Sequence, residues 1–221
     1  IKVFNAQLPA VFSPHPLYDN FGEKVSREEA CAHLGLDTDR RYLLFFGLIR
    51  DYKGLDWLLE AFSKLTPHST HLTPHFSLII AGEFYSDGTK YHTKAEKLQL
   101  QDALEWRSEF IPDSEVRYYF SAADLIVQPY KTATQSGVTQ IGFHFEKPML
   151  VTNVGGLPEI VPHGKVGYVV EPQPQPIADA LVDFYTSHRE PELIEGVRAE
   201  KGKYDWSKMT QAFYSLFSQM K

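Results

Sequence analysis

The fold is predicted most directly by residues 42–65, whose sequence is YLLFFGLIRDYKGLDWLLEAFSKL. This stretch begins with a continuous apolar run over residues 42–46, which ends at Gly47. Such a run is typical of a strand buried on both faces of a parallel sheet. Leucine and phenylalanine then recur at helical spacing over residues 55–65. The stretch therefore predicts a strand, a loop and a helix in immediate succession.

The same succession repeats along the chain. A capping-box sequence beginning at Ser26 predicts a short helix that stops at Gly35. Apolar runs predict further strands at residues 76–82, 104–111, 125–128, 148–152 and 167–170. Helical spacing predicts helices at residues 90–100, 115–122, 137–145, 177–187, 191–203 and 207–220. This alternation predicts an α/β fold: a Rossmann-like parallel sheet with helices on both faces.

The length and the prolines indicate how the chain is organised. At 221 residues it is expected to form one domain with appendages, or at most two small domains. Residues 1–25 are rich in proline and predict an extended linker segment. The alternating prolines of residues 171–176 predict a stiff connector. Because the chain opens on Ile1 rather than methionine, we expect a fragment or a processed form.

Composition argues against several classes of protein. The net charge of −6 and the pI near 5.8 disfavour a nucleic-acid platform. No stretch approaches the roughly 18–20 apolar residues of a membrane span, and no signal peptide is visible in these residues. Cys31 is the single cysteine, so no internal disulfide can form. A reducing compartment fits this usage, and we expect a cytoplasmic location.

Ligands of open α/β sheets bind at the carboxyl ends of the strands. The loops after residues 46, 80, 110, 128 and 152 are therefore expected to converge on one crevice. One of these loops contains the run Thr134-Gln135-Ser136-Gly137, at the predicted start of a helix. Unpaired backbone N–H groups at a helix start attract phosphate. Simple N-capping by Thr134 or Ser136 explains the run equally well.

The loop from Gly47 to Gly54 contains two cations, Arg50 and Lys53. An arginine fork and a lysine point charge together suit a diphosphate, although loop cations are more often merely solvated. Neither Gly-x-Gly-x-x-Gly nor Gly-x-x-x-x-Gly-Lys-Ser/Thr follows any predicted strand. Dinucleotide oxidoreductases and P-loop enzymes are therefore disfavoured.

Two further patterns are open to structural or chemical interpretation. Gly155 and Gly156 follow a predicted strand, where they would let backbone approach a ligand or simply form a turn. The histidines at 68, 71 and 75 match no standard zinc spacing, and neighbouring prolines break any helix that would align them. We therefore predict no metal site. No catalytic triad or acid/base carboxylate pair can be recognised either.

Taken together, the loops resemble the nucleotide-sugar-binding half of retaining glycosyltransferases of family 4, the glycosyl transferases group 1, which adopt the GT-B fold. The matching segments run in the family's order across residues 42–170. They are Phe45-Phe46-Gly47, Lys53-Gly54, Ile79-Ile80-Ala81-Gly82, Phe110-Ile111-Pro112-Asp113, Ala122-Ala123-Asp124, Gln128-Pro129, Lys147-Pro148, Gly155-Gly156-Leu157-Pro158-Glu159 and Gly164 to Gly167.

The resemblance implies a C-terminal GT-B half that uses a nucleoside-diphosphate sugar as donor substrate, with neither cofactor nor metal. It implies that Lys53, with Arg50 nearby, neutralises the departing diphosphate. Backbone of Phe110 and Ile111 would meet the nucleobase. The implied donor-binding set is completed by Gly47, Thr134, Gln135, Ser136, Gly137, Val138, Gly155, Gly156 and Glu159.

The resemblance also implies a second, N-terminal domain that binds the acceptor. The nucleotide-sugar domain would then span residues 26–205, and residues 206–221 would form a helix crossing back to that other domain. This fragment alone is expected to be inactive as a hexosyltransferase. Any peripheral membrane contact would be made through the other half.

Two departures from the family pattern leave an alternative open. The arginine expected directly after Gly47 comes later, at Arg50, and Leu48 takes its place. The Glu-x7-Glu pair that contacts donor sugar and ribose falls on Ala133 and Ile141, although Ala-Thr-Gln-Ser-Gly is a variant seen in a branch of the family. Gln135 and Gln140 are candidate replacements. The alternative is a catalytically silent nucleotide-sugar-binding or regulatory module. An epimerase on this fold would require acid/base carboxylates or histidines in the crevice, and a phosphorylase would require a pyridoxal-binding lysine. The sequence gives no clear sign of either.

Overall fold

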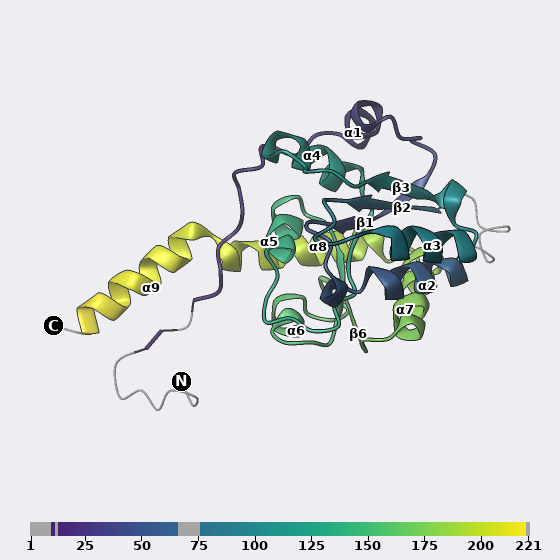
Figure 1. Ribbon diagram of the computed structural model, residues 1–221. Coiled ribbons are helices and arrows are strands. Elements are labelled where there is room, and N and C mark those ends of the chain that lie inside the picture. The colour runs from purple at the N-terminus through teal and green to yellow at the C-terminus, as the bar shows by residue number, and fades with distance from the viewer. Residues whose placement is uncertain (1–9, 12, 66–75, 220–221) are drawn as a thin grey trace.

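The computed structural model describes residues 10–11, 13–65 and 76–219. In this part of the chain six strands form one sheet, and every neighbouring pair is parallel. The strand order is β3-β2-β1-β4-β5-β6 (Figure 1). The strands are β1 (Arg41–Phe46), β2 (Phe76–Ala81), β3 (Leu104–Arg107), β4 (Leu125–Gln128), β5 (Met149–Thr152) and β6 (Gly167–Val170). The predicted α/β fold with a Rossmann-like parallel sheet is confirmed.

Helices cover both faces of the sheet (Figure 1). The α-helices are α1 (Arg27–Leu34), α2 (Leu55–Leu65), α3 (Thr89–Lys97), α4 (Asp113–Ala122), α5 (Gly137–His144), α6 (Leu157–Ile160), α7 (Pro174–Thr186), α8 (Glu190–Lys201) and α9 (Trp206–Gln219). Short 3-10 turns are η1 (Asp51–Lys53), η3 (Gln101–Ala103) and η4 (Gly202–Tyr204). Helices α2, α3 and α7 pack on one face, while α1, α4 and α5 pack on the other.

The opening strand explains why both faces need a cover. In β1, Leu43 and Phe45 point into one core, while Tyr42 and Leu44 point into the other, and all four side chains are buried. Successive side chains of a strand face opposite ways, so an apolar run without alternation demands a helix layer on each side. The continuous apolar run therefore correctly predicts the central strand of the sheet.

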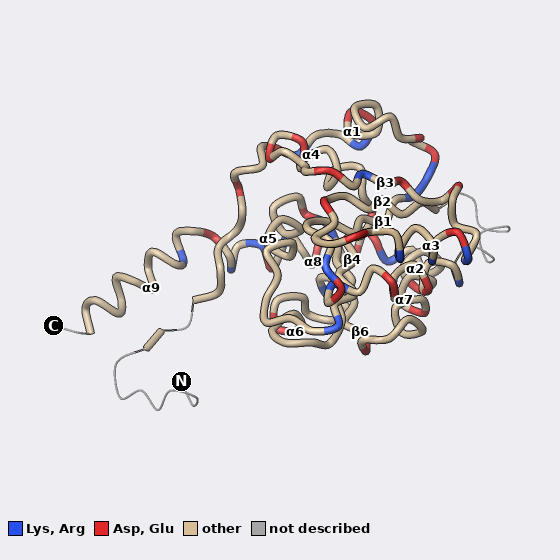
Figure 2. The backbone as a smooth tube through the Cα atoms, viewed as in Figure 1, with Lys and Arg blue, Asp and Glu red and all other residues tan. Residues whose placement is uncertain are grey.

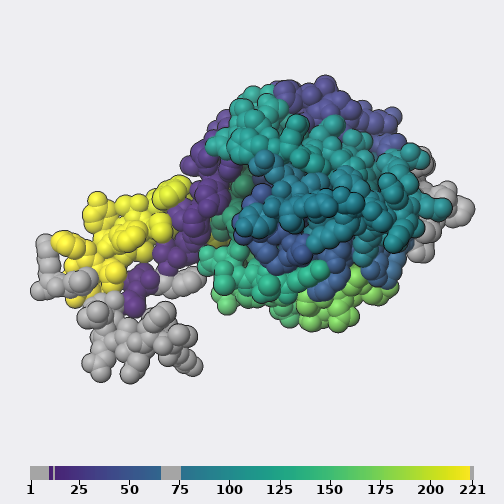
Figure 3. Space-filling view, in the orientation of Figure 1, coloured from purple at the N-terminus to yellow at the C-terminus, as the bar shows by residue number. Residues whose placement is uncertain are grey.

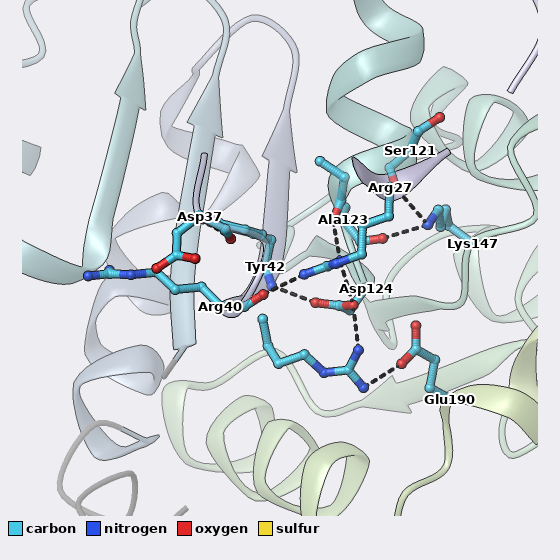
Figure 4. A network of polar contacts seen from close by, with 11 residues as sticks. Arg27, Asp37, Arg40, Tyr42, Ser121, Ala123, Asp124, Lys147 and Glu190 are labelled. Carbon is cyan, nitrogen blue, oxygen red and sulfur yellow. Dashed lines mark hydrogen bonds and ion pairs between the residues drawn. The ribbon is translucent and has the colours of Figure 1, made fainter. Parts of the chain in front are cut away.

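A buried polar network ties the amino-terminal ends of β1 and β4 together (Figure 4). Asp124 is 1% exposed, accepts a 2.5 Å hydrogen bond from the Tyr42 backbone N–H, and pairs with Arg27 and Arg41 at 2.9 Å each. Three partners satisfy the carboxylate, which a buried charge requires. The network lies at the end of the strands opposite to the expected ligand crevice.

Cationic side chains also donate hydrogen bonds to the carboxyl end of α4, because its last carbonyls have no partner within the helix. Arg27 donates to Ala122 O at 2.7 Å, and Lys147 Nζ donates to the carbonyls of Ser121 and Ala123 at 3.1 and 2.7 Å (Figure 4). Two segments that contribute to the family resemblance, those around Asp124 and Lys147, thus have a structural role in this chain.

The structure corrects two predicted elements. The predicted strand at 104–111 ends at Arg107, because only its first residue, Leu104, is buried and the rest of the stretch turns outward. The proline-rich stretch 171–176 is not all connector: Pro174 begins α7. Proline suits the first turn of a helix, since its missing N–H would be unsatisfied there anyway. The histidines at 68, 71 and 75 lie outside the described residues.

Two segments extend away from the sheet together. Residues 10–25, called here the N-terminal segment, have no regular secondary structure where described, and α9 projects beside them (Figures 1 and 3). No described residue of α9 is buried, and Trp206, Phe213, Tyr214 and Phe217 are exposed large side chains. The helix carries few charges (Figure 2). Within the described residues, none of the helices is both long and apolar enough to cross a membrane.

Candidate functional site

The strand order identifies the place where a ligand is expected. From β1 the chain moves outward to β2 and β3, and then returns to lay β4 on the other side of β1. The loops after β1 and β4 therefore leave in opposite directions, which opens a crevice at their carboxyl ends. The loop after β1 contains Gly47 to Gly54, and the loop after β4 leads to α5. The two loops predicted to bind an anion thus adjoin this crevice.

Close backbone packing fixes the loop after β1 against the loop after β4. Gly54 has φ +72°, and a Cβ atom added to it would lie 2.0 Å from the carbonyl oxygen of Pro129. The Lys131 N–H donates to Tyr52 O at 2.7 Å. Only glycine permits both the left-handed backbone and this contact. Lys53, directly before Gly54, is thereby placed over the end of β4.

Lys53 is a buried cation without a counter-charge. Its side chain is 8% exposed, and it makes no hydrogen bond or ion pair with any residue that the structure describes. A Cβ atom added to Gly47 would lie 3.1 Å from Nζ, which places the ammonium group beside that glycine. Burial, and then the nearby charge of Arg50, lower the pKa of Lys53 from 10.5 to about 8. A buried unpaired charge is costly, and an anion would relieve that cost.

The start of α5 completes the anion-binding features. Ser136 is the N-cap residue, and its Oγ accepts a 3.3 Å hydrogen bond from the Val138 N–H. The hydroxyls of Tyr130 and Ser136 share a hydrogen bond of 3.2 Å, and the Tyr130 ring lies 5.8 Å from Lys53 Nζ. Among the described residues the Gly137 N–H has no acceptor. Capping and an open anion position therefore coexist at this helix start.

These features surround one cavity of about 320 Å³, called here the first cavity. Of the residues predicted from sequence, Lys53, Gln135, Ser136, Gly137 and Val138 line it. Ile141 also lines it, so an apolar side chain takes the place where the family pattern has a glutamate. The structure thus brings together the cation, the hydroxyl and the helix start that the sequence places in two separate loops.

A second cavity of about 220 Å³ adjoins the first at Gly47. Phe110 and Ile111 line it together with Gly82 and Glu83. Phe110 is 67% exposed, so its ring is free to stack on a planar group. The two predicted base-contacting residues therefore lie on the far side of Gly47 from Lys53.

The remaining predicted residues after β5 lie apart from Lys53. Gly156 and Glu159 line a third cavity, of about 260 Å³, which shares Gln135 with the first. Gly155 has φ +53°, and a Cβ there would lie 1.9 Å from Ala133 O. The Gly156 N–H donates to Thr134 O at 2.9 Å. The glycine pair and Thr134 thus hold two loops together, and neither Gly155 nor Thr134 lines these cavities.

Arg50 lies outside the first cavity. Its guanidinium group stacks over the Tyr85 ring, 4.1 Å from the centroid, and its side chain is exposed. It is close enough to lower the pKa of Lys53 electrostatically. In this conformation Arg50 contributes positive potential to the site rather than a direct contact.

Sequence reasoning missed four aromatic residues of the first cavity, Tyr18, Phe21, Tyr52 and Tyr130. Tyr52 and Tyr130 could have been found, because each lies in a loop directly after a predicted strand. Tyr18 and Phe21 belong to the N-terminal segment, which has no periodic pattern. Nothing in the sequence indicates that this segment returns to the crevice. No group of three or more metal-ligating side chains occurs among the described residues.

The architecture resembles that of known proteins. The closely similar solved structures include HepE from Anabaena in complex with UDP, with a TM-score of 0.73 and 18% identity, covering 90% of this chain and 54% of that one. They also include the isolated C-terminal domain of the group 1 glycosyl transferase LpcC from Francisella tularensis, with a TM-score of 0.72 and 19% identity, covering 85% of this chain and 97% of that one. The fold is thus that of the C-terminal domain of GT-B glycosyltransferases.

The family follows from the sequence match. The model of the family described as glycosyl transferases group 1 matches residues 40–187, and the chain belongs to this family. Among curated relatives, the D-inositol 3-phosphate glycosyltransferase of Streptomyces bingchenggensis is 26% identical over 221 residues, covering 96% of this chain and 48% of that protein. The chain spans about half the length of the curated relatives it matches.

Proposed function

We propose that this domain binds the nucleoside-diphosphate-sugar donor of a retaining glycosyltransferase that works without a metal ion. The observation that carries the proposal is Lys53, a buried and unpaired ammonium group beside Gly47. A nucleoside diphosphate has parts that suit the adjoining cavities: a base for Phe110 and Ile111, and a diphosphate for Lys53 and the α5 N-terminus. The UDP bound to HepE, which has the same fold, supports this choice of ligand class.

The chemical role of Lys53 follows from the charge that develops in sugar transfer. The bond between the anomeric carbon and the diphosphate oxygen breaks, and negative charge accumulates on the departing diphosphate. A fixed ammonium group, a hydroxyl and a free N–H would stabilise that charge. The acceptor, a glycan, a lipid or another hydroxyl compound, would be bound by the other half of the whole protein. This chain alone would bind donor without transferring sugar.

Ile141 favours a second candidate function, a nucleotide-sugar-binding module that has lost catalysis. It is buried and lines the first cavity at the position of the family glutamate. An apolar side chain cannot hydrogen-bond to a donor sugar or ribose. A full-length protein containing this chain that binds nucleotide and transfers no sugar from any of a panel of donors would support this candidate.

The binding proposal is tested by calorimetric titration of the 221-residue chain with UDP, GDP and ADP. One nucleotide is expected to bind, and Lys53→Met should weaken it by about 10-fold or more, because a charge-assisted contact is lost. Ser136→Ala should weaken it by about 3-fold. Ser26→Ala is the matched control, because Ser26 also caps a helix through its Oγ, at α1. If no nucleotide binds, or if Lys53→Met binds as tightly as wild type, the proposal is wrong.

The affinity should also depend on pH. An anion favours the protonated form of Lys53, and the pKa of the free site is about 8. Above about pH 7, where the terminal phosphate is mostly doubly ionised, nucleotide affinity should therefore fall as the pH rises through and above the Lys53 pKa. The Lys53→Met variant should lack this decline. A pH series of the same titration from 6.5 to about 9.5 measures the effect.

A further inference from the structure

Tyr18 packs directly on the start of α5. A Cβ atom added to Gly137 would lie 3.0 Å from Tyr18 Cε2 and 3.6 Å from the hydroxyl oxygen. The ring is therefore in contact with the first turn of α5, where the Gly137 N–H is free of any acceptor among the described residues. Within the described part of the chain the Tyr18 hydroxyl makes no hydrogen bond. A donor group is thus available at the anion-binding end of the first cavity.

The N-terminal segment is anchored on both sides of this tyrosine. The Leu17 N–H donates to Tyr204 O at 2.9 Å, and the Trp206 indole N–H donates to Leu17 O at 3.2 Å. On the other side, His144 Nε2 donates to Gly22 O at 2.8 Å. Between these anchors Tyr18 and Phe21 face the first cavity, where their rings contact edge to face at 6.3 Å. The segment is held as a wall of the cavity by residues of η4, α5 and α9.

We infer that Tyr18 is a donor-binding residue, which covers the N-terminus of α5 and donates its hydroxyl proton to the diphosphate held there. The inference rests on the proposed function. It adds a contact from outside residues 40–187, the part of the chain that the family match covers. The aromatic ring would exclude water from the anion position, which strengthens every electrostatic contact inside.

The two hydrogen bonds at Leu17 make the position of the N-terminal segment dependent on residues near the carboxyl end of the chain. Tyr204 and Trp206 hold both backbone groups of Leu17, directly before Tyr18. The two segments that leave the sheet side by side therefore jointly determine where the tyrosine lies (Figure 1). If the Trp206 indole N–H is removed, the affinity for the anion should fall only because Tyr18 is no longer held in place.

The inference is tested with pyrophosphate, UDP and uridine as probes of the 221-residue chain. Tyr18→Ala is expected to weaken pyrophosphate and UDP by the same factor, about 10-fold or more, and Tyr18→Phe by about 3-fold. Uridine, which lacks phosphate, should bind equally to all three proteins. Tyr214→Ala and Tyr214→Phe are matched controls, because Tyr214 is exposed on α9 away from the cavity, and should change nothing.

Two further measurements distinguish direct contact of Tyr18 with the anion from a general change in the structure of the variant. Trp206→Phe should weaken pyrophosphate by about 2-fold to 3-fold in the wild-type background and have no effect in the Tyr18→Ala background. The reactivity of Lys53 toward an amine reagent, followed by mass spectrometry without nucleotide, should rise in Tyr18→Ala, and its pH midpoint should move upward. Both effects require that Tyr18 covers the cavity.

The outcomes distinguish the inference from the proposed function. If wild type binds UDP and Lys53→Met weakens it, while Tyr18→Ala binds pyrophosphate within about twofold of wild type, only the inference on Tyr18 is overturned. Tighter binding by Tyr18→Ala would overturn it too, because the ring would then obstruct the site. If wild type binds none of UDP, GDP, ADP and pyrophosphate, both the inference and the proposed function fail.

Discussion

At the scale of single residues, two buried lysines of this domain differ in what surrounds their charge. Burial lowers the pKa of both Lys53 and Lys147 to about 8. The Lys147 ammonium group donates to the carbonyls of Ser121 and Ala123, whereas the Lys53 ammonium group donates to none of the described residues. Lys147 therefore holds the end of α4 in place. Lys53 costs stability in the free domain, and that cost is recovered only when an anion binds.

This difference predicts opposite effects of the same substitution. Lys53→Met should raise the free energy of unfolding at pH 7 by about 2–4 kcal/mol, since it removes a buried unpaired charge. Lys147→Met should lower it by about 1–3 kcal/mol, because two buried carbonyls lose their partner. Urea unfolding of both variants beside wild type measures the two changes. A destabilised Lys53→Met variant would contradict the account.

The increase in the free energy of unfolding caused by Lys53→Met should also disappear at high pH. The folded-state pKa of about 8 lies below the ordinary value of 10.5, so between these values the unfolded chain binds more protons than the folded one. The stability of wild type relative to the variant should therefore rise from pH 8 toward pH 10.5. Comparing the variant with wild type at each pH isolates the contribution of Lys53, because the lowered pKa of Lys147 affects the stability of both proteins equally.

At the scale of elements, the site depends on how closely two loops approach. Gly54 ends η1 in a left-handed conformation and touches the backbone at Pro129. This contact sets the distance between the loop containing Lys53 and the end of β4. Without it, the lysine and the hydroxyl at Ser136 would belong to separate parts of the surface.

Gly54→Ala should lower the free energy of unfolding by about 3 kcal/mol or more, because a Cβ atom would overlap the Pro129 carbonyl as well as strain the backbone. Gly35→Ala is the matched control. Gly35 has φ +67° and has no atom within 4 Å of an added Cβ. The Gly35→Ala substitution should lower the free energy of unfolding only by the backbone strain, about 1 kcal/mol. Equal losses in urea unfolding would show that the close approach is unimportant.

At the scale of the whole molecule, the part of α9 that follows Trp206 is separable from the packed domain. The helix projects from the body of the molecule (Figure 3). None of its described residues is buried, and it exposes the large side chains of Trp206, Phe213, Tyr214 and Phe217. A large apolar surface of this kind usually marks an interaction site. That α9 crosses back to an N-terminal domain stays a prediction from the family resemblance.

Deleting residues 208–221 should therefore change the free energy of unfolding by less than about 1 kcal/mol. Leu181→Ala, in the fully buried part of α7, should cost about 2–5 kcal/mol in the same assay. The shortened chain should also self-associate less, which light scattering measures. A loss comparable to that of Leu181→Ala would show that α9 belongs to the domain core.

The parallel sheet, the capped helix at Ser26 and the two loops that contain Lys53 and Ser136 could all be predicted from the sequence. Each of these follows from local pattern: apolar runs, capping residues and the rule that loops after parallel strands share one edge. The sequence misplaced the end of β3 and the start of α7, because short apolar runs and prolines do not reveal which side chains become buried.

Which loop residues lie in contact depends on the folding of the whole chain and could not be predicted from local patterns. The tertiary structure placed Lys53 in a buried position without a counter-charge, turned Arg50 toward Tyr85, and assigned Gly155 to packing. It also brought Tyr18 onto α5 from a segment more than a hundred residues away in sequence. Burial and long-range contact depend on the packing of the whole chain, so no local pattern encodes them.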